Sequence, residues 1–291
     1  MSQPQESFAV RVQRALPAKT MGRIVRWLSR SENVLLKKIL IHSFIRLYNV
    51  NLSEALNPDP DSYRSFNDFF IRELKPGARV IDDSADSVCS PADGTFAEFG
   101  TIRGSQMLQA KGIHYTLEQL FGGAEMAAQQ FANGVFSTIY LAPYNYHRIH
   151  MPMNGRLIKS IHIPGNLLSV NAATTAQCPG LYATNERLIQ IFSGDKGPFA
   201  LVMVGALNVG SITTNWGGEI PGHVRELGHH YLHTKENAGK IEYKKGDYIG
   251  HFNLGSTVIL VAGPEQGISW VDYFHPGDTV QMGELIARHS Q

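Results

Sequence analysis

The sequence contains only two cysteines, Cys89 and Cys178, among its 291 residues. Two cysteines are too few for a disulfide framework, and their spacing is not that of a metal site. No apolar run reaches the roughly 20 residues that a membrane-spanning helix needs, and no signal-peptide pattern opens the chain. These absences exclude a disulfide-stabilised secreted scaffold, argue against a spanning helix and favour a reducing compartment.

A net charge of one sign is also missing, because the chain as a whole carries only +1 at pH 7. The charge is instead unevenly distributed. Residues 8–48 contain nine basic residues and one acid, Glu32, whereas the rest of the chain contains 17 basic and 24 acidic residues. A segment of +8 beside a body of −7 predicts attraction to an anionic surface, and nucleic acid and anionic lipid both fit.

The basic segment has helical periodicity over residues 8–50. Its apolar positions are Val25, Trp27, Leu28, Leu35, Leu36, Ile39, Leu40, Phe44, Ile45 and Tyr48. Helices that carry Trp and Leu beside Arg and Lys suit a membrane interface that they enter without crossing. We therefore expect residues 1–60 to form a membrane-associating helical region. The alternative is a helical layer packed on the body, with its charges exposed to solvent.

The remaining residues, 61–291, read as a β-rich catalytic body. A short helix is expected from Ser65, ended by the Lys75-Pro-Gly sequence, and 28 glycines and 14 prolines indicate many turns. Strands are expected at residues 134–141, 157–163, 188–192, 199–204, 211–214, 257–261 and 279–282. There is no strand–helix alternation of the doubly wound kind, so the predicted fold class is α+β.

Four short segments carry residues with chemical potential. They are Pro91-Ala-Asp-Gly94, Tyr146-His-Arg-Ile-His150, Ala206-Leu-Asn-Val-Gly210 and Leu254-Gly-Ser-Thr257. Each alone has a structural explanation as a turn or a loop. Together, Asp93, His150 and Ser256 supply the three groups that activate a hydroxyl, provided that the fold brings them together.

The residue before Ser256 indicates what that hydroxyl would do. Gly255 has no side chain, so its carbonyl carbon is approachable and its backbone is free to adopt unusual dihedral angles. Attack of the Ser256 hydroxyl on this carbonyl would convert the peptide bond to an ester. β-Elimination would then cut the chain and leave a dehydroalanine, which hydrolyses to a pyruvoyl group. A tight turn into a strand is the competing interpretation.

The chain resembles the phosphatidylserine decarboxylase proenzymes of bacteria over nearly its full length. The resemblance is carried by an ordered set of motifs: SFNDFFIRELKPGARVID (65–82), SPADG (90–94), KGIHYTLEQLFGG (111–123), LAPYNYHRIHMP (141–152), GNLLSVN (165–171), LYATNERL (181–188), ALNVGSI (206–212) and KGDYIGHFNLGST (245–257). Such a set is far more specific than any one of its members.

This resemblance implies self-cleavage between Gly255 and Ser256, within the Leu-Gly-Ser-Thr motif. It implies a β chain of residues 1–255 and an α chain of residues 256–291, which form a heterodimer, and leaves open whether these assemble into a homo-oligomer. Ser256 would become the covalent pyruvoyl cofactor. That group would form a Schiff base with the amine of phosphatidylserine and accept electrons during decarboxylation to phosphatidylethanolamine, so neither pyridoxal phosphate nor a metal ion is expected.

The same resemblance assigns roles to individual residues. It maps the self-cleavage triad onto Asp93, His150 and Ser256, and a role in decarboxylation onto His147. An imidazole titrates near neutral pH, so His147 is the expected proton donor. The implied location is peripheral, at the cytoplasmic face of the inner membrane, with the N-terminal helices on anionic lipid rather than nucleic acid.

One stretch departs from the expected pattern. His229, His230 and His233 lie in a histidine-rich segment whose spacing is compatible with a metal site, although a surface loop is the preferred interpretation. Two other enzyme classes stay open at this point, a serine hydrolase with an intact Ser256 hydroxyl and a β-rich metal hydrolase. A membrane-binding module with a carrier-like barrel is the non-enzymatic alternative.

Overall fold

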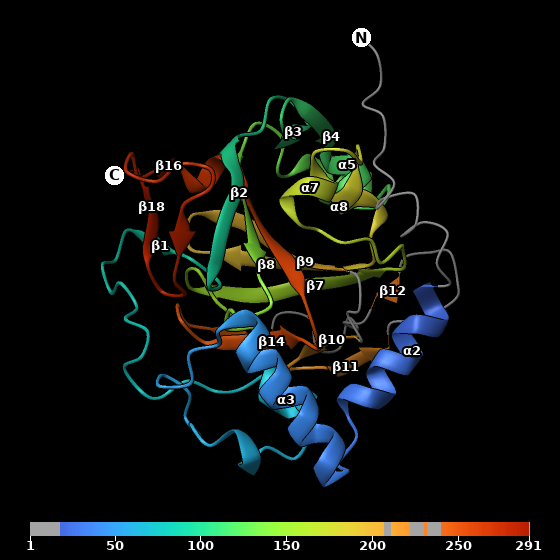
Figure 1. The fold of residues 1–291 in the computed structure, drawn as a ribbon. Coiled ribbons are helices and arrows are strands. Elements are labelled where there is room, and N and C mark those ends of the chain that lie inside the picture. Colours follow the sequence, from blue (N-terminus) through green and yellow to red (C-terminus); the bar gives the residue numbers. More distant parts are fainter. Residues whose placement is uncertain (1–17, 207–210, 222–229, 232–239, 291) are drawn as a thin grey trace.

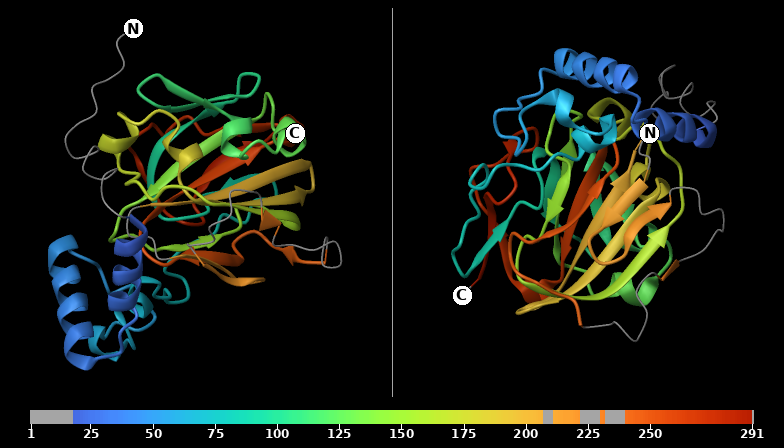
Figure 2. Two further views of the ribbon diagram at one scale, coloured as in Figure 1. Left: turned by 90° about the vertical axis from the view of Figure 1, so that its right-hand side faces the viewer. Right: turned by 90° about the horizontal axis from the view of Figure 1, so that it is seen from below.

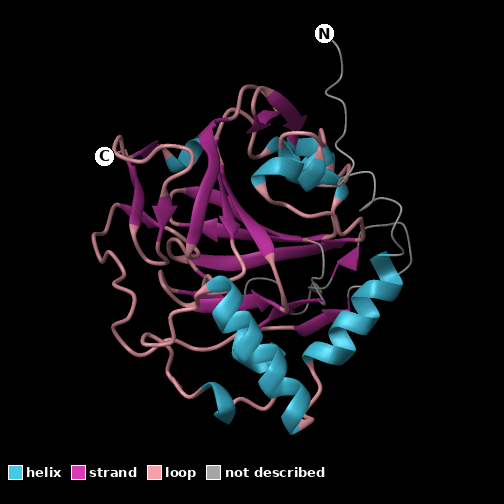
Figure 3. Ribbon diagram, in the orientation of Figure 1, coloured by secondary structure: helices cyan, strands magenta, loops and turns pink. Residues whose placement is uncertain are grey.

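The structure is a computed structural model, and it describes residues 18–206, 211–221, 230–231 and 240–290. A strongly twisted antiparallel sheet forms its centre, with smaller sheets and short helices around it (Figure 1). Figure 3 shows how strands dominate the body while the two longest helices lie to one side. The predicted α+β class, with N-terminal helices on a β-rich body, is confirmed.

In the described part of the chain, the central sheet has nine strands in the order β12-β7-β8-β9-β15-β5-β2-β17, with β13 paired to β7. The strand expected at residues 211–214 has the same bounds in the structure. The other expected strands are extended or shortened by one or two residues at their ends, because alternating apolar side chains fill both faces. The bounds are β2 Gly94–Thr101, β5 Val135–Leu141, β7 Gly155–Ile163, β8 Arg187–Gly194, β9 Gly197–Gly205, β12 His230–Tyr231, β13 Glu242–Tyr243, β15 Ser256–Ala262 and β17 Thr279–Val280.

Smaller elements cover the central sheet. A four-stranded sheet has the order β11-β10-β14-β6, a three-stranded sheet has the order β1-β18-β16, and β3 pairs with β4. Their bounds are β1 Ser87–Cys89, β3 Gln106–Ala110, β4 Ile113–Thr116, β6 Arg148–His150, β10 Ser211–Thr214, β11 Gly218–Pro221, β14 Tyr248–Phe252, β16 Ile268–Trp270 and β18 Leu285–His289. The short helices are α5 Leu117–Leu120, α6 Glu125–Gln129, α7 Ala172–Thr175, α8 Leu181–Thr184 and η2 Pro264–Gln266.

Two hydrophobic cores lie on opposite faces of the central sheet. In β15, Ile259 and Val261 point into the core covered by the β3–β4 hairpin and the short helices. Val258 and Leu260 point into the core shared with the four-stranded sheet. Since side chains alternate along a strand, Ser256 faces the same side as Val258 and Leu260, which is the side of β14 and β6.

The N-terminal helices are α2 (Ala18–Ser29) and α3 (Val34–Tyr48), followed by η1 (Pro60–Ser62) and α4 (Phe66–Phe70). Figure 2 shows α2 and α3 in blue at one edge of the molecule. α3 buries Ile41 in a small core with Val50, Tyr63 and Phe69, separate from the cores of the sheet. No helix in the described residues is long and apolar enough to cross a membrane.

Helix α4 is shorter than the sequence predicted. It begins after its N-cap Ser65, as expected, but it ends at Phe70 instead of continuing to Lys75. The reason is that the next residues leave the helix to pair with an earlier segment: Leu74 bridges Ala55, and Leu56 N–H donates to the carbonyl of Glu73.

Candidate active site

The candidate residues meet at one end of the central sheet. Ser256 begins β15 and pairs with Leu141, the last residue of β5, and with Gly205, the last residue of β9. Asp93 directly precedes β2, the neighbour of β5 on its other side. The loop that follows Leu141 leads to His147 and to β6. The starts of β15 and β2 and the ends of β5 and β9, which are far apart in the sequence, therefore lie at the same end of the sheet.

Ser256 is buried, with 1% of its surface exposed. Its Oγ has no hydrogen-bond partner among the described residues. An unpaired buried hydroxyl costs about 1–3 kcal/mol, a cost that the hydroxyls of Ser137, Ser160 and Thr257 in the same sheet also bear among the described residues. The hydroxyl is therefore available for chemistry and is not fixed by a structural bond.

The backbone before Ser256 is strained. Leu254 has φ +89° and Gly255 has φ +47°. A positive φ is free of steric cost for glycine but costs about 1–3 kcal/mol for a branched residue such as leucine. Gly255 thus uses the backbone freedom that its missing side chain allows, and Leu254 adds strain one residue before it.

His147 lies beside this turn and is completely buried. Its backbone carbonyl accepts a hydrogen bond from Phe252 N–H, and its ring lies 4.1 Å from the ring of Phe70 between centroids. Nδ1–H donates to the carbonyl of Asn145 at 2.9 Å, which leaves Nε2 as a bare acceptor with no partner in the described structure. Burial lowers the pKa of His147 to about 3, so the ring is neutral at pH 7.

His150 ends strand β6 and is also held in one tautomer. Its Nδ1–H donates to the carbonyl of Gly246 at 2.8 Å, and the hydroxyl of Tyr146 donates to Nε2 at 2.9 Å. Burial lowers the pKa of His150. The negative charge of Asp93 acts in the opposite direction and raises it, but by less. A neutral imidazole with a lone pair on Nε2 has the form that a general base requires.

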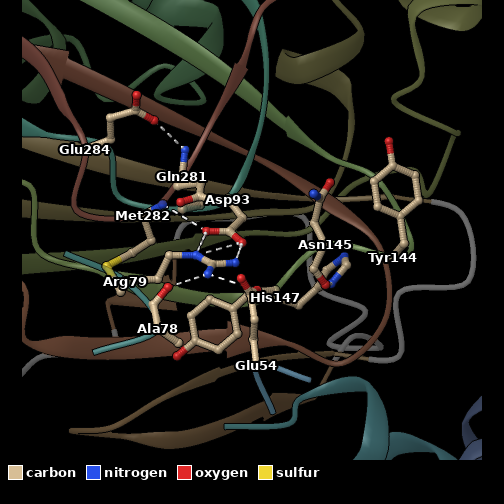
Figure 4. Close-up of polar contacts among 12 residues, drawn as sticks. Glu54, Ala78, Arg79, Asp93, Tyr144, Asn145, His147, Gln281, Met282 and Glu284 are labelled. Atoms are coloured by element: carbon tan, nitrogen blue, oxygen red, sulfur yellow. Dashed lines mark hydrogen bonds and ion pairs between the residues drawn. The ribbon is translucent and has the colours of Figure 1, made fainter. Parts of the chain in front are cut away.

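Asp93 is bound by a different partner. Its carboxylate accepts from Arg79 Nε at 2.9 Å and from the backbone N–H of Met282 at 2.9 Å, as Figure 4 shows. Arg79 also pairs with Glu54 at 3.0 Å. These two carboxylates hold the pKa of Arg79 above its usual range, although burial acts against them.

The fold thus brings the three proposed triad residues to one end of the sheet but not into a hydrogen-bonded chain. In the described structure, no hydrogen bond joins Asp93 to His150 or His150 to Ser256. Asp93 stabilises the segment before β2, whereas the tautomer of His150 is fixed by a main-chain carbonyl.

Three supporting residues were not singled out from the sequence. Arg79 binds Asp93, Tyr146 binds His150, and Asn253 is buried two residues before Gly255. All three lie inside the quoted motifs, so the motifs marked their segments. Their partners are distant in sequence or set by backbone direction, which periodicity does not reveal.

Most of the histidines considered as metal ligands lie outside the residues that the structure describes. His229 and His233 lie outside the described residues, as does the 207–210 segment with Asn208, and His230 is described only by its backbone pairing with His162. Within the described ranges, no group of three His, Cys, Asp or Glu side chains is arranged to hold a metal ion. Cys89 and Cys178 are both buried, and they do not form a disulfide bond.

Comparisons with known proteins agree with this picture. The family model for phosphatidylserine decarboxylase matches residues 66–288, and a second model, described as PSD, matches residues 8–49. A phosphatidylserine decarboxylase proenzyme of Saccharophagus degradans is 42% identical over 97% of this chain and 98% of the relative.

Two further relatives have the same description. The proenzyme of Alkalilimnicola ehrlichii is 48% identical over 84% of this chain and 85% of its own length, and that of Coxiella burnetii is 44% identical over 93% and 94%. The chain therefore belongs to the phosphatidylserine decarboxylase family, a family of decarboxylases.

Proposed function

We propose that this chain is a self-processing phosphatidylserine decarboxylase that makes phosphatidylethanolamine with a pyruvoyl group formed from Ser256. Its relatives are named as proenzymes of that activity. One observation carries the proposal. The buried hydroxyl of Ser256, which has no hydrogen-bond partner in the described part of the chain, directly follows a turn in which Leu254 and Gly255 both have positive φ angles.

Self-cleavage begins when Ser256 Oγ attacks the carbonyl carbon of Gly255 and its proton passes to a base. The C–N bond breaks and an ester takes its place. Elimination at residue 256 then breaks the ester and frees the Gly255 carboxylate as the end of chain 1–255. The dehydroalanine takes up water and loses ammonia, which leaves a pyruvoyl group at the start of chain 256–291.

His150 is the proposed base, because its Nδ1–H is fixed on Gly246 and Nε2 carries the lone pair. The Tyr146 hydroxyl that now donates to Nε2 must turn away or relay the proton. Asp93 is proposed to assist through its charge, which favours protonated His150, and by holding Arg79 and Met282 at the end of the sheet.

The residues around position 256 fit a cofactor made from the serine itself, since its hydroxyl has no structural bond to lose. The pyruvoyl group, once formed, supplies a ketone that reacts with an amine and accepts the electrons left by departing carbon dioxide. His147 is proposed to return a proton from Nε2 to the substrate carbon. Because burial keeps this ring neutral, Nε2 must first take up a proton within the site.

The two chains are expected to stay together after cleavage. β15 comes from chain 256–291 and lies between β5 and β9, which come from chain 1–255. Each neighbour pairs with β15 over seven residues, so the new chain end is held inside the central sheet. A β/α heterodimer is therefore the proposed mature unit.

We also propose that residues 1–60 place the enzyme on anionic lipid at the cytoplasmic face of the inner membrane, with residues 61–291 as the catalytic domain. Apolar side chains are exposed along α2 and α3: Ile24, Trp27, Val34, Leu35, Ile39, Leu47 and Tyr48. Arg23 and Arg46 are exposed beside them. Such a face suits the boundary between headgroups and acyl chains.

Several basic residues of this region form contacts within the protein. Arg26 and Arg30 both pair with Glu219, and Lys37 and Lys38 contact residues 61–63. These charges dock the helices on the acidic body. The membrane proposal therefore depends more on the exposed apolar side chains than on the number of basic residues.

The experiment that tests this function measures phosphatidylethanolamine formation from phosphatidylserine in detergent micelles. Ser256→Ala should abolish the activity. Ser137→Ala is a matched control, since Ser137 is a buried serine of the same sheet whose hydroxyl also has no hydrogen-bond partner among the residues that the structure describes. An active Ser256→Ala variant would contradict the proposal. A serine hydrolase would instead hydrolyse esters as an uncut chain. A metal hydrolase would lose its activity when a chelator removes the metal ion.

A further inference from the structure

Arg72 is a buried arginine whose guanidinium group is only partly satisfied. It is 5% exposed, and Nη2 donates to the carbonyl of Tyr144 at 3.0 Å. Nε and Nη1 are buried and have no hydrogen-bond partner in the part of the chain that the structure describes. The guanidinium carbon lies 5.5 Å from the centre of the Phe69 ring, which provides no hydrogen-bond acceptor.

The other buried arginines show what a structural role looks like. Arg187 is 2% exposed, and its three nitrogens donate to the carbonyls of Leu120, Asn185 and Gln119. Arg79 pairs with two carboxylates. A buried charge without such partners is strongly destabilising, so Arg72 destabilises the fold unless another group accepts its remaining hydrogen bonds.

A cavity of about 240 Å³ lies beside Arg72. Its lining includes Arg72, Arg79, Asp93, Tyr144 and Asn145. This volume suits a polar headgroup rather than a whole lipid, which would need far more room. Asn49 and Asn51 also line it, and Asn49 caps the end of α3, next to the exposed face proposed to contact the membrane.

The lining of the cavity contains charged side chains of both signs. Arg79 is shared by Asp93 and Glu54, so these three groups together carry a charge of −1, while Arg72 carries +1 and has no direct acidic partner within the described ranges. A cavity lined by both acidic and cationic side chains suits a ligand that carries both an amine and an anionic group. A phospholipid headgroup with an amine and a phosphate diester has that charge pattern.

We propose that Arg72 binds the phosphate diester of the phospholipid headgroup in this cavity, an inference that rests on the function proposed above. The phosphate is favoured over the carboxylate for a chemical reason. The carboxylate loses its charge as carbon dioxide leaves, so an arginine bound to it would stabilise the substrate more than the transition state. The phosphate keeps its charge throughout.

The position of Arg72 also connects the phosphate to the reaction. Burial is the main reason for the low pKa of His147, and the charge of Arg72 adds to it. An anion on Arg72 would offset that charge and make protonation of His147 Nε2 easier. Substrate binding would thereby prepare the residue that we propose as proton donor.

Binding of water-soluble headgroups to the full-length, uncut Ser256→Ala protein tests this proposal. Isothermal titration calorimetry would compare glycerophosphoserine, glycerophosphoethanolamine and free serine. We expect both phosphodiesters to bind and Arg72→Gln to weaken both by about 10- to 100-fold, the usual worth of hydrogen bonds to a charged group. Arg64→Gln, a change at an exposed arginine on the same segment, should have no effect.

Three results would overturn the proposal. Arg72→Gln could lose binding of glycerophosphoserine alone, which would assign Arg72 to the carboxylate, or it could bind both phosphodiesters as tightly as its parent. The third result is that the Ser256→Ala parent protein binds neither phosphodiester. If Arg72→Gln does not fold, Arg72→Lys replaces it. Lysine keeps the charge but not the planar fork, so both affinities should fall by about tenfold, and unchanged binding would overturn the proposal.

The extent of self-cleavage distinguishes a failure of the proposed function from a failure of the inference about Arg72. With Ser256 intact, the wild-type chain and Arg72→Gln should both be cut, since cleavage needs no substrate anion. An uncut wild-type chain would contradict the proposed function, while the headgroup titrations would still decide the role of Arg72.

Discussion

Asn67 donates its side-chain amide to the side-chain carbonyl oxygen of Asn253 over 2.9 Å, although 186 residues separate them. Asn253 in turn donates from its amide to Ser211 Oγ and Thr213 Oγ1, both at 2.9 Å. Its backbone N–H donates to the carbonyl of Ser211. The residue two positions before Gly255 is therefore fixed by α4 on one side and β10 on the other.

We call these hydrogen bonds of Asn253 with α4 and β10 the Asn253 clamp. The clamp predicts that Asn253→Ala slows self-cleavage. The substitution leaves buried groups unpaired, at a cost of about 1–3 kcal/mol each, and frees the strained turn that follows. We expect the cleavage rate to fall at least tenfold in a time course followed by gel electrophoresis. Asn67→Ala, which removes one bond, should have a smaller effect, and the exposed Asn57→Ala none. Cleavage of Asn253→Ala at the wild-type rate would rule out the clamp.

Substitutions of His150 and His147 are expected to affect two different steps, self-cleavage and decarboxylation. His150→Ala should block or greatly slow cleavage, because it removes the proposed base. His147→Ala should still be cut, at least in part, yet lose decarboxylation. Intact mass and phosphatidylethanolamine formation measure the two outcomes. Normal processing of His150→Ala would remove it from the role of base, and full activity of His147→Ala would exclude it as the required proton donor.

The buried histidines should make the uncut protein sensitive to mild acid. Burial lowers the pKa of His147 to about 3 and of His251 to about 4, from an ordinary value of 6.5. Below pH 6.5 the unfolded chain binds protons that the folded chain does not. The stability present above pH 6.5 is therefore lost as the pH falls towards the folded values.

For His147 alone, this loss is about 1.5 kcal/mol between pH 6.5 and pH 5. Denaturant unfolding of the Ser256→Ala protein at these two pH values would measure it. His147→Asn should reduce the difference, while the exposed His275→Asn should not. A free energy of unfolding with no dependence on pH in this range would show that the buried rings titrate as they do in water.

The exposed apolar face of α2 and α3 predicts binding to vesicles. Replacing Leu35 and Leu47, which are 70% and 74% exposed, with serine should lower binding to vesicles of phosphatidylglycerol and phosphatidylcholine. Two leucine side chains are worth about 1.5–3 kcal/mol each when fully buried, so a drop of at least tenfold is expected in co-sedimentation.

The control for this experiment uses apolar residues that are just as exposed but lie elsewhere. Val80 and Met126 are 81% and 90% exposed, and neither belongs to α2 or α3. Changing both to serine should leave vesicle binding unchanged. Equal losses for the two pairs would show that the N-terminal helices are not the contact surface.

The strands could be predicted because their apolar residues are packed on both faces of one sheet. Residues 199–204 and 257–261 read as short β runs, and β9 and β15 contain them with little change at the ends. The length of α4 could not be predicted in this way. Its last turn competes with the pairing of Leu74 and Ala55, which lie 19 positions apart.

The motifs located the candidate site but not its contacts. Asp93, His147, His150 and Ser256 were selected by residue type and resemblance, and all four lie at one end of the sheet. The ion pair between Asp93 and Arg79 depends on how a loop returns to the sheet. The positive φ of Leu254 is a property of the backbone that leucine does not favour by itself.

The intact mass of freshly purified, active wild-type protein, before and after borohydride treatment, tests the central claim most directly. We expect two chains, residues 1–255 and 256–291, with a keto group at the start of the second that borohydride reduces. An active protein that is one continuous chain of 291 residues, with an unmodified Ser256, would contradict it.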